Sequence, residues 1–137
     1  MRKHFLIGVD PGVCTGFAVW DQEVGKFELI TSCTILNAMR WVNDWKLRGK
    51  CSVWVEDARQ RKWFGGSGRE KLMGAGSIKR DCQIWEEFLH SGNLPYRFIP
   101  PKDIRTKLNA KKFKAMTGWQ NRTNSHGRDA AMIVFGA

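Results

Sequence analysis

The chain lacks the features that mark secreted, membrane-spanning and zinc-ribbon proteins. Its 137 residues include only four cysteines, and no two of them form a CxxC pair, so the sequence gives little support for a zinc site. It has no run of about 18 apolar residues, as a membrane span needs. The apolar run at residues 5–9 is also shorter than a signal-peptide core. These absences predict one soluble, cytoplasmic domain over residues 1–137, with free thiols that serve as small apolar side chains.

Acidic residues are also scarce, because 13 of them stand against 23 lysines and arginines, for a net charge of +10. The positive excess is concentrated in residues 59–71, with a net charge of +4, and in residues 102–114, with a net charge of +5. A merely solubilising surface would spread its charge, whereas concentrated positive charge favours a polyanionic partner. We therefore expect nucleic acid as the partner; two solvated, lysine-rich loops are the alternative.

Hydrophobic patterning predicts an α/β chain with the element order β-β-β-α-β-α-β-α-α. Short turns between the first three strands predict an antiparallel meander. A right-handed crossover through the first helix would then place the fourth strand beside the first, in parallel. The expected strands cover residues 5–10, 16–21, 27–33, 52–57 and 96–99, and the expected helices cover residues 35–48, residues 70–90, pieces from Pro101 to Met116, and a last helix capped by Asn124 or Ser125.

Three acidic residues fall where this fold would bring them together. Asp10 ends the first strand, Glu56 ends the fourth, and Asp129 lies in the apolar last helix. Sites of α/β proteins form at such carboxyl ends of strands. Three adjacent carboxylates repel one another unless a cation neutralises them, and hard oxygen ligands select Mg²⁺ or Mn²⁺, two of which can activate water for phosphodiester hydrolysis. Each acid alone also fits a helix cap or a surface charge, and Asp57 should point to the face opposite Glu56.

Residues 7–16 (IGVDPGVCTG), 53–56 (VWVE) and 125–131 (SHGRDAA) form three short motifs in a fixed order, and residues 73–76 (MGAG) open a long predicted helix. This set resembles the motifs of the RuvC-type Holliday-junction resolvases, which belong to the RNase H-like superfamily. The resemblance covers most of the chain, whose short length is similar to that of phage-type members. The loop after residue 56 departs from the pattern of cellular members.

The resemblance implies a five-stranded mixed sheet with helices on both faces and a homodimer. It also implies Mg²⁺-dependent (or Mn²⁺-dependent) paired nicking of four-way DNA junctions, with no membrane contact and no small-molecule cofactor. Asp10, Glu56 and Asp129 would ligate the metal, with two ions in each site. Family members carry an acid or a histidine at the position of His126, one helical turn before Asp129, so His126 is expected to be a ligand or a proton-transfer group.

The expected DNA contacts lie in the two basic segments. Trp63 and Phe64 occupy a Gly-rich basic loop, and the resemblance agrees with stacking of an aromatic on bases near the junction centre. Alternatively, both rings fold back onto the core or the partner subunit. The helix over residues 70–90, with Trp85 and Leu89, is the expected dimer interface. The expected nucleic-acid-binding residues are Arg61, Lys62, Trp63, Phe64, Arg69, Lys107, Lys111 and Lys112.

Three other functions compete with this interpretation. Residues 10–16 (DPGVCTG) also resemble the first phosphate loop of actin-like ATPases, which need two such domains to enclose a nucleotide, whereas 137 residues supply one. A nuclease of the same fold acting on other DNA or on RNA–DNA hybrids is the second alternative. The third is a nucleic-acid-binding module without catalytic activity, and Mg²⁺-dependent cleavage would separate it from the nucleases.

Overall fold

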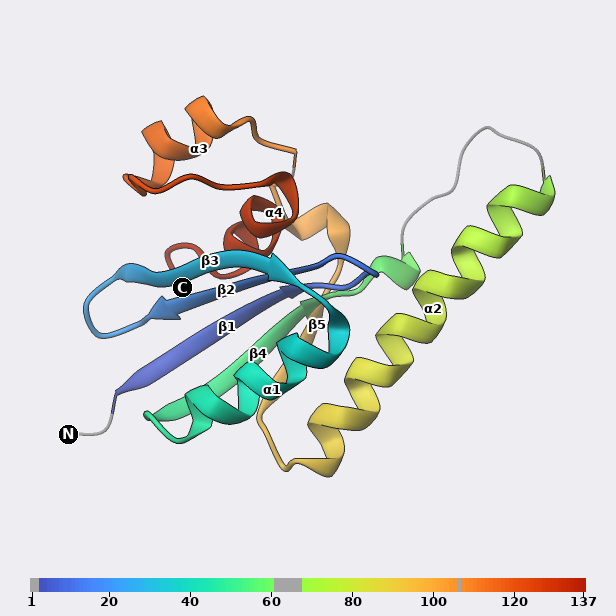
Figure 1. Cartoon of the computed structure of the whole chain (residues 1–137), viewed down its shortest axis with the longest axis horizontal. Coiled ribbons are helices and arrows are strands. Elements are labelled where there is room, and N and C mark those ends of the chain that lie inside the picture. Colours follow the sequence, from blue (N-terminus) through green and yellow to red (C-terminus); the bar gives the residue numbers. More distant parts are fainter. Residues whose placement is uncertain (1–2, 61–67, 106) are drawn as a thin grey trace.

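The computed structural model describes residues 3–60, 68–105 and 107–137, with the side chains of residues 68–75 excepted. The predicted order of strands and α-helices is confirmed, and two short 3₁₀ turns are added to it (Figure 1). The elements are β1 (His4–Asp10), β2 (Thr15–Asp21), β3 (Lys26–Cys33), α1 (Ile35–Lys46), β4 (Lys50–Glu56), η1 (Ala58–Gln60), α2 (Gly68–Ser91), β5 (Tyr96–Ile99), η2 (Pro101–Asp103), α3 (Ala110–Thr117) and α4 (Ser125–Val134).

The five strands form one mixed sheet in the order β3-β2-β1-β4-β5. Strands β1, β2 and β3 pair antiparallel, as short turns require, while β1 pairs in parallel with β4 and β4 in parallel with β5. The crossover through α1 therefore brings the end of β4 to the end of β1, as the sequence predicts. This pairing confirms the expected meander and places the carboxyl ends of β1, β4 and β5 at one edge of the sheet.

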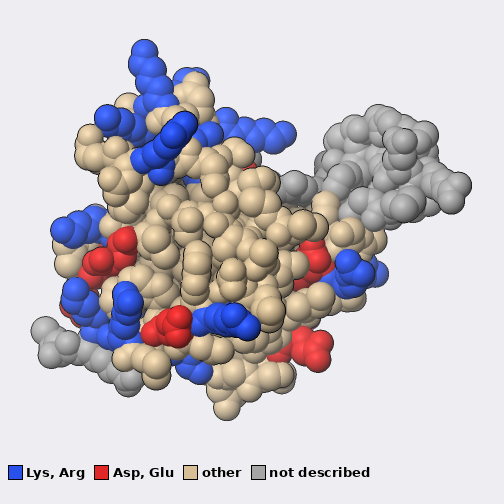
Figure 2. Space-filling view, viewed as in Figure 1, with Lys and Arg blue, Asp and Glu red and all other residues tan. Residues whose placement is uncertain are grey.

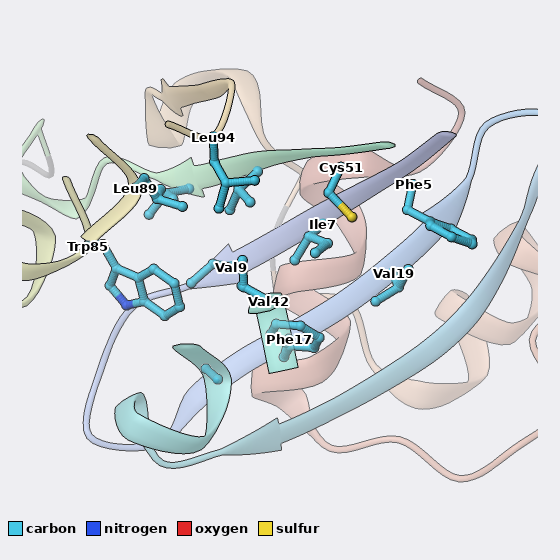
Figure 3. Close-up of a cluster of buried hydrophobic side chains, with 13 residues drawn as sticks. Phe5, Ile7, Val9, Phe17, Val19, Val42, Cys51, Trp85, Leu89 and Leu94 are labelled. Atoms are coloured by element: carbon cyan, nitrogen blue, oxygen red, sulfur yellow. The ribbon is translucent and has the colours of Figure 1, made fainter. Parts of the chain in front are cut away.

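Helices cover both faces of the sheet, because successive strand residues point to opposite sides. On one face, Phe5, Ile7 and Val9 of β1 pack with residues of α1 and α2, as Figure 3 shows for Val42, Trp85 and Leu89. On the other face, Leu6 packs with residues of α3 and α4, such as Phe113 and Ala130. The first face holds a hydrophobic core under α1 and α2, and the second holds a separate core under α3 and α4 (Figure 1).

Some predicted boundaries shift. Strand β4 ends at Glu56, so Asp57 lies just outside it, and α2 begins at Gly68 rather than at Glu70. Pro101 opens only a three-residue 3₁₀ turn, since the chain becomes extended again at Ile104. Asn124 is the N-cap of α4 and accepts a hydrogen bond from the Gly127 N–H, which settles the choice between Asn124 and Ser125.

The structure contradicts one prediction about α2. Trp85 and Leu89 are both 0% exposed and belong to the core of their own chain, so they are not a dimer interface. Together with Cys82, they form the buried face of α2, and their spacing of three to four residues reflects the packing of that face on the sheet. On the described part of α2, Ile84 is the large apolar side chain that faces solvent, at 38% exposure. No helix in the described ranges is long and apolar enough to cross a membrane.

Candidate active site

Asp10 and Glu56 lie next to each other at the carboxyl edge of the sheet. Val9 pairs with Val55 in the parallel register, so the following residue of each strand is Asp10 or Glu56. Adjacent strands are about 4.8 Å apart, which sets the spacing of the two backbones. Both side chains belong to the face covered by α4, since they alternate with Val9 and Val55, which face the other core. Asp10 is 6% exposed and Glu56 is 1% exposed, so two acids are held in a nearly dry environment.

The beginning of α4 is fixed tightly above these carboxylates. Asn124 caps the helix and also donates from Nδ2 to the Ser32 hydroxyl at 2.7 Å, which ties α4 to the end of β3. Gly16, the residue of β2 paired with Asp10, lies so close to α4 that a Cβ there would overlap the His126 carbonyl oxygen. Gly8 approaches the Ala130 carbonyl in the same way. These two glycines let the helix backbone rest directly on β1 and β2.

His126 is brought to the acidic pair by this packing. Its Nδ1 lies 4.0 Å from Asp10 Oδ2, and its side chain is half exposed. The ring therefore faces solvent on one side and a buried carboxylate on the other. Its expected role as a ligand or a proton-transfer group stays a prediction.

Asp129 lies one turn further along α4 and is engaged by the chain itself. Its Oδ1 accepts a hydrogen bond of 3.0 Å from the backbone N–H of Lys107. Within residues 3–60, 68–105 and 107–137, no three His, Cys, Asp or Glu side chains gather closely enough to form a metal site. The donors fit Mg²⁺ or Mn²⁺ in their chemistry, because carboxylate oxygens from two adjacent strands and one helix supply hard ligands. The geometry places Asp10 next to Glu56 on neighbouring strands and His126 next to Asp10, while Asp129 binds the backbone of Lys107.

Asp57 belongs to a different interaction, as its position in the sequence predicts. It accepts hydrogen bonds from Arg59 Nε at 2.7 Å and from Gln60 Nε2 at 3.0 Å. Burial by itself would raise the pKa of the Asp57 carboxyl, but the hydrogen bonds and charge of Arg59 and the bond from Gln60 lower it overall. Arg59 also reaches Glu86 of α2 at 3.7 Å. The Arg59 guanidinium is therefore paired with acidic side chains of its own chain, although Arg59 counts toward the positive charge of the first basic segment.

Two thiols flank this edge of the sheet. Cys14 is exposed in the turn after Asp10, and Cys33 ends β3 opposite Thr15. Burial, together with the neighbouring Cys14, raises the pKa of the Cys33 thiol to about 11. The described residues contain no disulfide, and Cys51 and Cys82 are the two buried thiols, so the prediction of small apolar side chains fits these two best.

The expected DNA-binding lysines are exposed on the side of the molecule that carries α3. Figure 2 shows lysine and arginine side chains gathered at the top of the view, above the sheet. Lys107, Lys111 and Lys112 are all exposed. Asn109 caps α3, so Lys111 and Lys112 lie in its first turn. The residues predicted to bind DNA that lie outside the described residues are Arg61, Lys62, Trp63 and Phe64. Arg69 lies within α2, and its side chain is outside the description.

Sequence reasoning missed the residues that position the site. Gly16 was treated only as part of a motif, although it sets the spacing between α4 and β2. Asn124 was treated only as a cap, although it also ties α4 to Ser32. The role of Lys107 depends on its backbone N–H, which no residue pattern reports. A glycine that pairs with a strand-end acid was the available signal, because strand glycines often mark close backbone approach.

Comparison with solved structures identifies the fold. The structure of Thermus thermophilus RuvC in complex with a Holliday junction substrate matches 94% of this chain and 89% of its own, with a TM-score of 0.56 and 15% sequence identity. A second Thermus thermophilus RuvC structure matches with 14% identity, 94% and 90% coverage and a TM-score of 0.49. No protein-family model matches the chain, and no curated protein sequence matches it. The first match confirms the predicted RNase H-like fold, a five-stranded mixed sheet with helices on both faces.

Proposed function

We propose that this protein is a Mg²⁺-dependent endonuclease that cleaves branched DNA by phosphodiester hydrolysis, as a short, phage-type resolvase would. The observation that carries the proposal is the placement of Asp10 and Glu56 side by side at the sheet edge, with His126 of α4 within 4.0 Å of Asp10. The similarity of the fold to a RuvC structure solved with a Holliday junction supports the choice of substrate.

Asp10, Glu56 and Asp129 are the proposed metal ligands, with His126 as a fourth ligand or a proton-transfer group. Bound Mg²⁺ or Mn²⁺ would supply an activated water and stabilise the leaving oxygen, with two ions in each site. Asp10 and Glu56 are both nearly buried, and the repulsion between two adjacent carboxylates favours a bound cation. His126 lies beside Asp10 and is half exposed to solvent.

The DNA backbone would lie across the exposed lysines of the 102–117 segment, with Lys107, Lys111 and Lys112 as contacts. The segment that follows Glu56 would supply Arg61, Lys62 and Arg69 for the backbone, and the rings of Trp63 and Phe64 for stacking on bases. Because a four-way junction has two-fold symmetry, two matched nicks require a symmetric pair of sites, so we propose a homodimer. Its interface excludes Trp85 and Leu89, and its mass in sedimentation with and without junction DNA tests it.

The decisive test is Asp10→Asn, because this change removes a ligand charge and keeps the side-chain volume. Purified protein is incubated with Mg²⁺ and matched four-way, three-way, duplex and single-stranded DNA, and products are resolved on denaturing gels. We expect the wild type to cut the four-way substrate best. Asp10→Asn should abolish cleavage and leave DNA affinity largely unchanged.

Asp44→Asn is the matched control, since Asp44 is an exposed acid on α1 that loses the same charge away from the proposed site. It should cleave like the wild type. Wild-type cleavage by Asp10→Asn would be fatal to the site assignment.

A second function, a DNA-binding module without catalysis, is favoured by one observation. No group of three metal-type side chains converges in the described part of the chain. Tight junction binding with no cleavage in either Mg²⁺ or Mn²⁺ would select this alternative. Equal cleavage of duplex and branched DNA would instead select a nuclease of the same fold with a broader substrate.

A further inference from the structure

Lys107 has an unusual backbone conformation for its residue type. Its φ is +60°, in the left-handed region, which only Asn93 shares among the non-glycine residues that the structure describes. Glycine and asparagine adopt this region readily, whereas a lysine pays a steric cost between its Cβ and the following carbonyl. A conformation of this kind persists where surrounding contacts demand it.

Hydrogen bonds on either side of this conformation join Lys107 and Leu108 of the 104–109 segment to α4. The N–H of Lys107 donates to Asp129 Oδ1 at 3.0 Å, and the neighbouring Arg128 donates from Nε to the Leu108 carbonyl at 2.9 Å. Arg128 also donates from Nη1 to the carbonyl and hydroxyl of Thr123, so its guanidinium bridges two segments that flank the helix. Ile104 anchors the other end of the segment in the core beneath α3 and α4.

We propose that Lys107 is a positioning residue that orients the Asp129 carboxylate for the metal through its backbone N–H, while its side chain contacts the DNA backbone. This inference rests on the proposed function. Fixing Oδ1 from the linker leaves Oδ2 of the same carboxylate as the oxygen for a cation, in the way that hydrogen-bonded carboxylates commonly serve metal sites. One residue then connects the basic 102–117 segment to the metal ligands, so metal binding and DNA engagement are coupled.

Backbone and side-chain roles can be separated by substitution. Lys107→Gly removes the cation but favours the left-handed conformation, so the N–H stays on Asp129. Lys107→Val also removes the cation, but its branched Cβ strongly disfavours that conformation. Lys111→Ala is the matched control, because Lys111 is an exposed lysine of the same segment, located in α3.

The first readout is Mn²⁺ affinity without DNA, measured by calorimetry on variants whose melting temperature is recorded. Lys107→Gly and Lys111→Ala should bind Mn²⁺ within about twofold of the wild type, while Lys107→Val should bind about 10-fold more weakly, the lower end for loss of a hydrogen bond to a ligand. In DNA binding, Lys107→Gly and Lys111→Ala should each lower the log–log salt slope by about 1. Wild-type Mn²⁺ affinity in a folded Lys107→Val overturns the inference.

A second measurement decides the matter if Lys107→Val fails to fold. In the wild type, the amide resonance of Lys107 should shift on titration with Mg²⁺ and should move upfield in Asp129→Ala, while the amide of Lys111 responds to neither. An unresponsive Lys107 amide overturns the inference. Failure of the proposed function looks different, because Asp10→Asn would then leave Mn²⁺ affinity unchanged.

Discussion

The close approach of α4 to Gly16 of the sheet yields a prediction that can be worked out in detail. Gly16 of β2 pairs with Asp10, and a Cβ added to Gly16 would overlap the His126 carbonyl oxygen and lie 3.0 Å from the Asp10 Cβ. The overlapping atom belongs to a helix backbone and cannot rotate away like a side-chain tip. In Gly16→Ala, the start of α4 must therefore move by about 1 Å, a displacement that can cost on the order of 100-fold in rate.

Gly8→Ala is the matched control for this change. Its Cβ would overlap the Ala130 carbonyl of the same helix, but Gly8 lies deeper under α4 and two residue pairs away from the strand-end acid. Overpacking costs about 1–3 kcal/mol, and a backbone obstacle places both variants at or above the upper end. We expect both to melt several degrees below the wild type, by similar amounts.

The assay compares Mg²⁺-dependent cleavage per folded molecule at a temperature well below both melting transitions. Gly16→Ala should lose about 100-fold in rate, and Gly8→Ala should lose clearly less, because only the first displaces His126 from its 4.0 Å contact with Asp10. A Gly16→Ala protein that melts like the wild type would refute the close packing. Equal rates for the two variants would refute the placement of the site at His126 and Asp10.

Three further predictions follow from charge, stacking and burial. Replacing Lys111 and Lys112 together by alanine should lower the log–log salt slope of DNA binding by about 2, and an unchanged slope would place these lysines away from the phosphates. Replacing Trp63 and Phe64 by alanine should weaken junction binding, at about 1–3 kcal/mol per lost stack, while hardly changing the melting temperature; a large drop in melting temperature would make them core residues. Asp57→Ala should lower the free energy of unfolding by about 1–3 kcal/mol near pH 7. Because the pKa of Asp57 is lowered on folding, its stabilising contribution is present above the unfolded pKa of about 3.9 and is lost as pH falls through the folded pKa. The difference between wild type and Asp57→Ala in urea unfolding should therefore vanish in acid. A difference that stays constant with pH would contradict the ion pair.

The sequence predicts the sheet well because its signals are local or periodic. The continuous apolar run of β1 marks a buried central strand, and the short turns around β2 determine its antiparallel pairing. The handedness of the crossover through α1 then places β4 beside β1. Asp10 and Glu56 could be brought together by this logic alone. The same periodicity misled the assignment of Trp85 and Leu89, because an apolar helix face fits a core and a dimer interface equally well, and only the position of α2 on the sheet distinguishes them.

The position of Asp129 could not be predicted for a different reason. Its helix and its apolar neighbours are evident from the sequence, but its partner is a backbone N–H from a residue 22 positions away. The same Lys107 takes the left-handed conformation, which its residue type does not predict. Backbone hydrogen bonds carry no sequence signature, so a positioning contact of this kind is visible only in three dimensions.

The two basic segments, which look alike in composition, differ in how much charge they can offer to DNA. Arg59 in the first is 2.7 Å from Asp57 and 3.7 Å from Glu86, so its charge is largely balanced within the protein. In the second, Lys102, Lys107, Lys111 and Lys112 are all exposed. Counterion release depends on cations that reach phosphates. The salt dependence of DNA binding should therefore arise to a larger extent from the second segment, which also holds Asp129 through Lys107. Electrostatic attraction would thus act mainly through the segment whose Lys107 backbone binds Asp129 of α4.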